Sequence, residues 1–197
     1  TDLDSLDSWI FRDKFLVKEI IDLESITINE SLNKLGLNYI DWFKIDSQGT
    51  DLRIIKSISP NIRNKISVLD IEPGIVNAYK HEDKLSDVLE YMDKSFYIDD
   101  IKLKGSQRIN SKVSKKYFSK LDHKLFQFAN KESKLWGEIT FINNYDDRTL
   151  FSKRDILFYC AILILKKQYL YCIEIRDFYE NLFSDPLFKK IKKFCIR

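Results

Sequence analysis

Glycine and proline are scarce in this 197-residue chain, which has five Gly and three Pro. This scarcity excludes collagen-like and low-complexity proteins, and it favours long regular elements over many tight turns. The three Cys are too few for a disulfide scaffold, and the first residues contain no apolar signal stretch. We therefore expect the chain to work in a reducing compartment, the cytoplasm.

Long apolar runs are missing as well. The longest run is the ten residues from Ile156 to Leu165, which stand between Asp155 and Lys166. A helix needs roughly 20 apolar residues to cross a bilayer. The run therefore predicts a buried helix, and we expect no membrane partner.

Motifs of common enzyme classes do not occur. The sequence has no P-loop, no G-x-S-x-G, no dinucleotide-binding fingerprint, and no HExxH or CxxC pair. His81 and His123 are not spaced to share a metal ion, and neither Cys160 nor Cys172 has an adjacent His that would activate it. We therefore expect no catalytic residue, no metal and no cofactor, and hence no enzyme.

Aromatic and charged residues are abundant. Fourteen Phe, ten Tyr and three Trp supply enough apolar surface for a packed core, which excludes a disordered chain. Residues 101–124 hold eight basic residues against one acidic residue, and residues 189–197 hold five against none. The remainder is acidic, so direct nucleic-acid binding through these two segments is the less favoured hypothesis. We expect 189–197 to be an amphipathic connector helix, and 101–124 to be either a solvated loop or a segment that closes over an anionic ligand.

The N-terminal part predicts two helices and a hairpin. Helical spacing of apolar residues favours helices over 9–23 and 28–35. Thr27 and Glu30 stand at capping-box spacing before the second helix, and Gly36 can end it. Residues rich in β-branched and aromatic side chains then predict strands over 38–46 and 51–58, joined as a hairpin, and a third strand over 65–71.

The middle of the chain is less regular. We predict a short helix over 75–80 and a further helix that Asp83 caps. Residues 97–120 show weak periodicity and predict irregular structure. The strand pattern returns in a second hairpin, with strands over 125–128 and 136–142.

The last predicted element is a long helix. Ser152 can cap its start, and Asp155 complements the positive end of its dipole. The helical pattern continues to about Phe183, which predicts a rod of about 45 Å. A small domain cannot cover such a rod completely, so we expect its later turns to pair with another chain or another domain.

The order of these elements resembles that of GAF-type sensor domains. Three segments are similar to that family's motifs: residues 71–78 (IEPGIVNA), 136–142 (WGEITFI) and 151–155 (FSKRD). The resemblance implies an α/β (α+β) fold, with an antiparallel sheet of five or six strands over residues 1–168. It implies that N- and C-terminal helices cover one face, and that the 72–123 segment lies on the ligand side of the sheet.

A narrower resemblance concerns residues 171–183, YCIEIRDFYENLF. They look like the connector that follows the sensor in purine-catabolism and sugar-diacid type bacterial transcription regulators. This implies a non-catalytic domain that binds a small-molecule effector, forms a homodimer through the 152–183 helix, and passes the signal through 169–197. DNA would be bound only by a further domain, in keeping with a first residue, Thr1, that suggests a segment of a longer protein.

The GAF resemblance also implies a ligand pocket lined by aromatic side chains and a histidine. The candidate residues are Tyr39, Phe43, Tyr79, His81, Tyr91, Tyr97, Phe126 and Phe128. Two alternatives stay open. One is a GAF-like dimerisation module that binds no ligand. The other is a GAF-like redox enzyme of the free methionine sulfoxide reductase type, which needs reactive cysteines beside the pocket.

Overall fold

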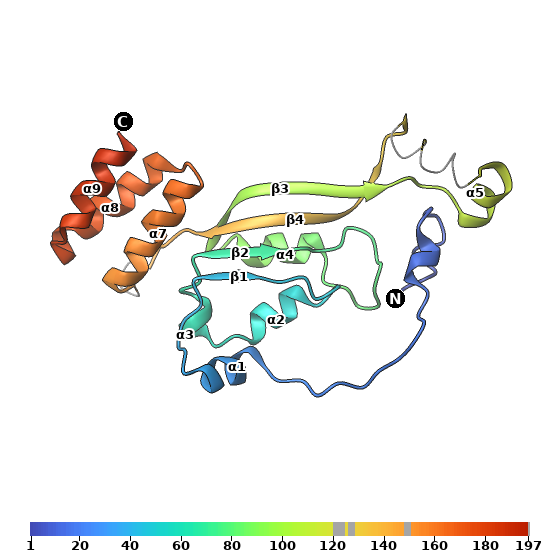
Figure 1. Ribbon diagram of the computed structural model, residues 1–197, viewed down its shortest axis with the longest axis horizontal. Coiled ribbons are helices and arrows are strands. Elements are labelled where there is room, and N and C mark those ends of the chain that lie inside the picture. The colour runs from blue at the N-terminus through green and yellow to red at the C-terminus, as the bar shows by residue number, and fades with distance from the viewer. Residues whose placement is uncertain (120–124, 126–128, 148–150, 197) are drawn as a thin grey trace.

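The computed structural model describes residues 1–119, 125, 129–147 and 151–196, and its strands form one mixed sheet. The sheet contains β1 (Trp42–Lys44), β2 (Val68–Ile71), β3 (Phe96–Ser106) and β4 (Ser133–Asn143), in the order β1-β2-β4-β3 (Figure 1). β1 pairs with β2 in parallel, and the other two pairs are antiparallel. The predicted combination of helices with a sheet is confirmed. The predicted five or six antiparallel strands are not found in the described part of the chain, which has four strands, two of them parallel.

The parallel pair arises because the segment after β1 is helical. The predicted second hairpin strand, 51–58, is instead α2 (Asp51–Ser57), followed by α3 (Pro60–Arg63). Leu52 and Ile55 stand three residues apart on one helix face, and both are buried under the sheet. Two neighbouring parallel strands need such a crossover connection, whereas the predicted hairpin would have placed residues 51–58 beside 38–46 as an antiparallel strand.

One face of the sheet is covered by α2, α3 and α4 (Leu85–Met92) (Figure 1). The core on this face is made of aliphatic and aromatic side chains of the strands and of these helices: Ile45, Leu52, Ile55, Ile58, Ile66, Leu69, Ile71, Val88, Met92, Phe96, Ile139 and Phe141. The predicted third strand and the helix after Asp83 are thereby confirmed as β2 and α4, although the N-cap residue of α4 is Lys84 and not Asp83. The predicted helix over 75–80 is not present, because these residues form turns and bends.

β3 corrects the prediction of irregular structure over 97–120. It is an eleven-residue strand that pairs antiparallel with β4, with register shifts at Ile98/Asp100 and Lys104/Gly105. After its first residue, most of its side chains are half-buried or exposed. Apolar and polar residues alternate from Ile101 to Lys104, but the extra Asp99 at the first register shift separates this pattern from the apolar residues before it. The basic segment continues into α5 (Ser111–Tyr117).

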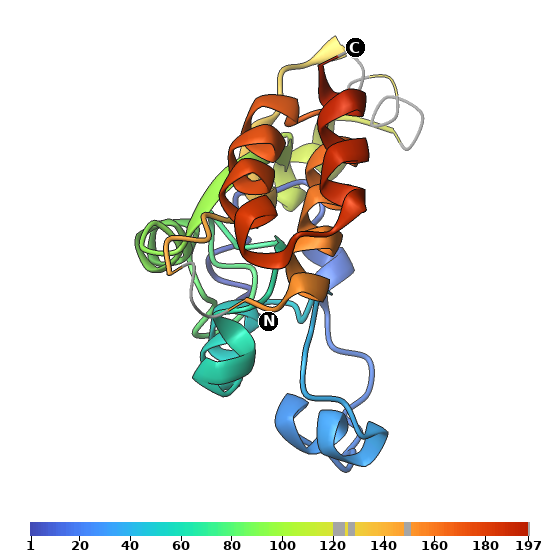
Figure 2. The same cartoon turned by 90° about the vertical axis from the view of Figure 1, so that its left-hand side faces the viewer.

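The C-terminal rod is broken, which corrects the prediction of one helix over 152–183. The chain forms α7 (Lys153–Leu165), α8 (Tyr169–Phe183) and α9 (Pro186–Cys195), which pack side by side at one end of the sheet (Figure 2). Lys167 has a left-handed backbone with φ of 60°, so the chain turns back after α7. Asp99 on β3 binds both sides of this turn, at 3.0 Å to the ammonium of Lys166 and 2.9 Å to the amide of Gln168.

This three-helix unit shares one core across the expected domain boundary at 168/169. Side chains of α7, α8 and α9 pack together with the start of β2 and the end of β4: Val68, Ile142, Tyr145, Phe151, Ile156, Tyr159, Cys160, Ile162, Leu163, Cys172, Ile175, Tyr179 and Phe188. Tyr145 stacks between Phe151 and Tyr159, with ring centroids 3.9 and 3.8 Å away. Residues 169–196 therefore pack back onto α7.

Local helix ends agree well with the sequence. Thr27 and Glu30 form the expected capping box of α1 (Ile28–Leu35), and Gly36 ends it in the left-handed conformation. The predicted helix over 9–23 is reduced to a short 3-10 helix, Arg12–Phe15, and residues 16–26 are not helical. Of the second predicted hairpin, 136–142 lies in β4, but Leu125 is helical and not in a strand, and 126–128 lies outside the described residues. Among the helices that the structure describes, none has the length and apolarity to cross a membrane.

Candidate functional site

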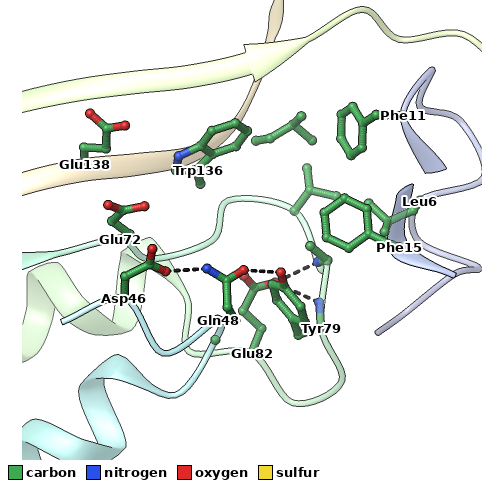
Figure 3. Close-up of a pocket in the computed structure, with 14 residues that line it drawn as sticks. Leu6, Phe11, Phe15, Asp46, Gln48, Glu72, Tyr79, Glu82, Trp136 and Glu138 are labelled. Carbon is green, nitrogen blue, oxygen red and sulfur yellow. Dashed lines mark hydrogen bonds between the residues drawn. The ribbon is translucent and has the colours of Figure 1, made fainter. Parts of the chain in front are cut away.

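A cavity of about 300 Å³ lies at the end of the sheet opposite the three-helix unit (Figure 3). Its walls come from four separate segments: the N-terminal residues 6–15, the loop after β1, the loop after β2, and the start of β4. β1 and β2 are parallel, so their carboxyl ends meet at this edge. Ligands of open α/β sheets bind outside the carboxyl ends of parallel strands.

One side of the cavity is apolar and aromatic. Phe11 and Phe15 come from the N-terminal segment, and Trp136 faces them from β4 (Figure 3). The rings of Phe11 and Phe15 lie 5.5 Å apart, and that of Phe15 lies 5.7 Å from Tyr79. Buried Leu6 and Leu135 lie behind them and join the N-terminal segment to β4. The segment 6–15 therefore forms a wall of the cavity.

The other side is acidic. Asp46 follows β1, Glu72 follows β2, and Glu138 lies on β4 (Figure 3). No Lys, Arg or His is found among the described residues that line the cavity. Lys44 and Lys104 approach Glu72 and Glu138 from outside, each at 3.5 Å.

Burial raises the pKa of Glu72 above its ordinary value, and the nearby Asp46 and Glu138 carboxylates raise it further. Lys44 opposes this shift in part. A raised pKa is expected for a carboxyl group whose ionised form is poorly solvated and lies near like charges. The surroundings of Glu72 therefore favour its protonated form.

A hydrogen-bonded chain joins the two sides. The Tyr79 hydroxyl donates to the side-chain oxygen of Gln48, and the Gln48 amide donates to the Asp46 carboxylate (Figure 3). Burial, together with the Glu82 and Asp46 carboxylates, raises the pKa of Tyr79. Tyr79 therefore stays a neutral donor at neutral pH.

Glu82 holds the loop after β2 in shape. Its side chain is only 6% exposed, and its carboxylate accepts hydrogen bonds from the backbone amides of Ala78 at 2.7 Å and Tyr79 at 3.3 Å. It packs on two glycines, because a Cβ on Gly74 would lie 2.4 Å from its carboxyl carbon and one on Gly49 would lie 3.1 Å from its Cγ. Gly49 also has a φ of 104°, which other residues rarely adopt.

Two further side chains fix the loop after β1. Buried Asp51 accepts from the amide and hydroxyl of Ser47 at 2.8 and 2.5 Å and from the amide of Glu72 at 3.0 Å, so it ties the two strand ends together. Arg53 donates to the carboxylate of Asp83 at 3.1 Å and to the carbonyl of His81 at 2.7 Å. Polar contacts between its loops, around the buried Asp51 and the more exposed Arg53, therefore set the shape of the cavity.

Comparisons with known proteins do not identify the chain. No family model, curated protein or solved structure matches it. The geometry of the site therefore carries the functional argument.

Of the residues expected to bind ligand, Tyr79 lines this cavity. His81 is nearby but exposed, and its backbone has a φ of 56°. Tyr39 precedes β1. The guanidinium of Arg154 lies 4.2 Å from the centre of the Tyr39 ring. Phe43 lies on β1 and packs against the core under the sheet.

The remaining candidates lie elsewhere. Tyr91 is on α4, with the ammonium of Lys56 4.8 Å from its ring centre. Tyr97 packs edge-on against Tyr171 of α8, at 5.7 Å, on the side of the three-helix unit. Phe126 and Phe128 lie outside the described residues, as does His123. The aromatic candidates are therefore distributed over both ends of the sheet.

Four residues of the cavity were not predicted as site residues: Asp46, Glu72, Trp136 and Glu138. Each lies in or directly after a predicted strand, so the signal was present in the segments FKIDSQG and LDIEPG. The site was not recognised because residues 38–46 were expected to pair with 51–58 in a hairpin. The structure instead pairs β1 directly with β2, in parallel, and this places Asp46 and Glu72 after neighbouring strands at the same edge.

The cysteines lie away from the cavity. Cys160 and Cys172 are buried in the three-helix unit, and Cys195 lies on α9. A hydrogen bond to the Cys160 carbonyl and burial raise the pKa of Cys172, and burial raises the pKa of Cys195 to about 11. In the part of the chain that the structure describes, no group of three or more His, Cys, Asp or Glu could hold a metal ion.

Proposed function

We propose that this chain is a non-catalytic regulatory domain that binds a small molecule in the cavity at the carboxyl ends of β1 and β2. The observation that carries the proposal is the cavity itself, about 300 Å³ in volume, with an aromatic wall facing three carboxylates and a tyrosine hydroxyl. Small-molecule sites are typically concave and largely apolar, with a few polar groups that orient the ligand. The GAF-type assignment stays part of this proposal and rests on the sequence motifs.

Regulation would act through the N-terminal segment, because it forms one wall of the site. The amide of Asp2 donates to the Ala78 carbonyl at 2.9 Å, and Leu6 and Trp9 pack on Leu135. A ligand that contacts both this segment and the loop after β2 favours the docked arrangement over any other. This replaces the continuous helix as the proposed route of the signal, because α7 and α8 fold back on each other.

The narrower proposal, a regulator of the purine-catabolism or sugar-diacid type, rests on residues 171–183, which lie in α8. Homodimerisation belongs to the same proposal. Leu170 and Leu182 on α8 are 85% and 63% exposed, which leaves apolar surface on the three-helix unit for a second copy. DNA contact would fall to another domain.

A second candidate function is acid–base catalysis, and one observation favours it. Glu72, whose pKa is raised, and Asp46 share a cavity at the carboxyl ends of parallel strands. Two carboxyl groups in unlike environments can serve as acid and base. A redox enzyme is less well supported, because none of the three cysteines lines the cavity.

The proposal is tested by thermal unfolding in the presence of a metabolite library. We expect at least one compound to raise the melting temperature of the wild type and of Trp42→Ala, but not that of Trp136→Ala. Both tryptophans are partly exposed strand residues, at 43% and 36%, and only Trp136 lines the cavity. A library without a stabilising compound, or equal shifts in the three proteins, would refute ligand binding at this site.

The same experiment separates the two candidate functions. A compound that binds is incubated with the protein and analysed by mass spectrometry. Regulation predicts that it is recovered unchanged. Chemical conversion that is lost in Glu72→Gln, while binding persists, would establish acid–base catalysis instead.

A further inference from the structure

The charge of the cavity restricts what it can bind. Asp46, Glu72 and Glu138 face it, and the described lining contains no cationic side chain. The two lysines that approach from outside are themselves 66% and 45% exposed, so water screens much of their effect. An anionic ligand would meet like charges, whereas a cation would relieve their repulsion.

The aromatic wall restricts the kind of cation. Trp136 lies next to the carboxylates, whereas Phe11 and Phe15 lie on the opposite side of the cavity (Figure 3). Aromatic faces attract ammonium groups and cover their carbon substituents. A bare metal ion gains little from such a wall, and the described residues offer no cluster of ligands that could hold one.

A hydrogen-bond donor that has no acceptor among the described residues lies next to this wall. The amide nitrogen of Gln107 is buried, and no hydrogen-bond partner is found for it within the described part of the chain. Gln107 is only 9% exposed and lines an adjoining cavity of about 520 Å³. Both cavities share Phe11, Phe15 and Trp136, so a ligand that extends past these rings reaches a buried donor that needs an acceptor.

We infer that the ligand is an organic ammonium compound with a hydrogen-bond acceptor beyond its apolar middle. Its cationic end lies among Asp46, Glu72 and Glu138, its carbon atoms lie against the aromatic wall, and its acceptor oxygen faces Gln107. This inference rests on the proposed function, because it assigns a chemical class to the ligand of that same cavity.

The test compares ammonium probes with neutral probes of the same shape. Acetylcholine and 3,3-dimethylbutyl acetate differ only in a quaternary nitrogen that is replaced by carbon, and choline and 3,3-dimethylbutan-1-ol form a second pair. Binding is measured by calorimetry at low and at physiological ionic strength. We expect each ammonium probe to bind at least about tenfold more tightly than its neutral counterpart.

Matched variants place the effect in the cavity. Glu72→Gln and Glu138→Gln each keep the shape of the side chain and remove its charge, and we expect each to weaken acetylcholine binding several-fold. Glu90→Gln, on the exposed side of α4 and outside the cavity, is the control and should leave binding unchanged. Gln107→Leu should weaken acetylcholine, which has a carbonyl acceptor, more than it weakens choline.

The outcomes distinguish the inference from the proposed function. Equal binding of charged and neutral probes, or ammonium binding that neither glutamine variant weakens, would overturn the inference. So would a library compound that is neutral or anionic and binds where the ammonium probes do not. In each of these cases a Trp136→Ala-sensitive ligand would leave the proposed function standing, whereas the absence of any such ligand would remove both.

Discussion

The carboxylate of Glu82 lies against the Cα of Gly74, so closely that a Cβ at that position would be 2.4 Å from the Glu82 carboxyl carbon. This contact closes the loop after β2 on itself. It brings Glu82 under the backbone amides of Ala78 and Tyr79, and Tyr79 then lines the cavity. The glycine of the segment EPG is required there because of the space that Glu82 occupies.

Gly74→Ala should therefore expel Glu82 and leave two backbone donors without their acceptor. We expect a loss of about 1–3 kcal/mol in the free energy of unfolding, measured with urea. Gly137→Ala is the matched control, because its added Cβ meets only side-chain atoms, of Ile139 at 3.4 Å and of Leu103 at 3.7 Å. Similar unfolding midpoints for the two variants would contradict this account of the loop.

Asp51 gives a second test of the loops, because its buried carboxylate joins Ser47 to the amide of Glu72. Asp51→Ala leaves these donors unpaired, and we expect it to cost about 2–4 kcal/mol in the free energy of unfolding. Asp93→Ala, at an exposed helix end, should change it by less than about 0.5 kcal/mol. An Asp51 variant as stable as the Asp93 variant would show that the two strand ends do not depend on this bridge.

Glu72 should make stability fall as the pH rises. Its pKa in the fold is raised by burial and by Asp46 and Glu138, with Lys44 opposing, so the folded state holds its proton more tightly than the unfolded chain. Stability from this group is therefore greatest below its ordinary value of 4.5 and declines as the pH rises through the raised pKa. Glu72→Gln should raise the melting temperature at pH 7, and its advantage should disappear near pH 4.

Glu30 should change stability with pH in the opposite direction, and the same experiment measures it. Hydrogen bonds from the Thr27 amide and hydroxyl lower its pKa, so its ionised form stabilises the fold. That stability is present above the ordinary value of 4.5 and is lost as the pH falls through the lowered pKa. Glu30→Gln should lower the melting temperature at pH 7. Parallel pH profiles for the two variants would refute the assignment of at least one of the two shifts.

A substitution of Lys167 tests whether the C-terminal helix is broken. Its φ of 60° is unfavourable for a lysine and suits glycine, so Lys167→Gly should raise the free energy of unfolding by about 0.5–1 kcal/mol. In a continuous helix over 152–183, the same substitution would instead lower it by about 1 kcal/mol. The sign of the change, measured by urea unfolding, thus distinguishes the helical hairpin from the rod.

Local features of this chain could be read from the sequence because a few neighbouring residues decide them. The capping box of Thr27 with Glu30 and the N-cap of Ser152 formed as expected, and Gly36 ended its helix in the left-handed conformation. Each depends on hydrogen bonds within four residues. β2, α4 and the core of β4 were also anticipated, because their apolar patterns are strong.

The cavity could be predicted only in part. Tyr79 was named, but through a family resemblance, and the carboxylates of Asp46, Glu72 and Glu138 were passed over as strand and turn residues. Residues 51–57 are rich in β-branched side chains, and a short apolar run of this kind fits a strand or a helix equally well. Assigning it to a strand made residues 51–58 the expected partner of β1, so the direct pairing of β1 with β2, which places Asp46 near Glu72, was not predicted.

The sequence by itself determined where α1 and α7 begin, where α1 ends, and that this chain folds with both helices and a sheet. Tertiary structure alone decided that β1 and β2 run parallel, and that α7 and α8 fold back at Lys167. The reason is distance along the chain. Asp99 holds the turn at Gln168 from 69 residues away, and the cavity gathers side chains from four segments whose meeting no local pattern encodes.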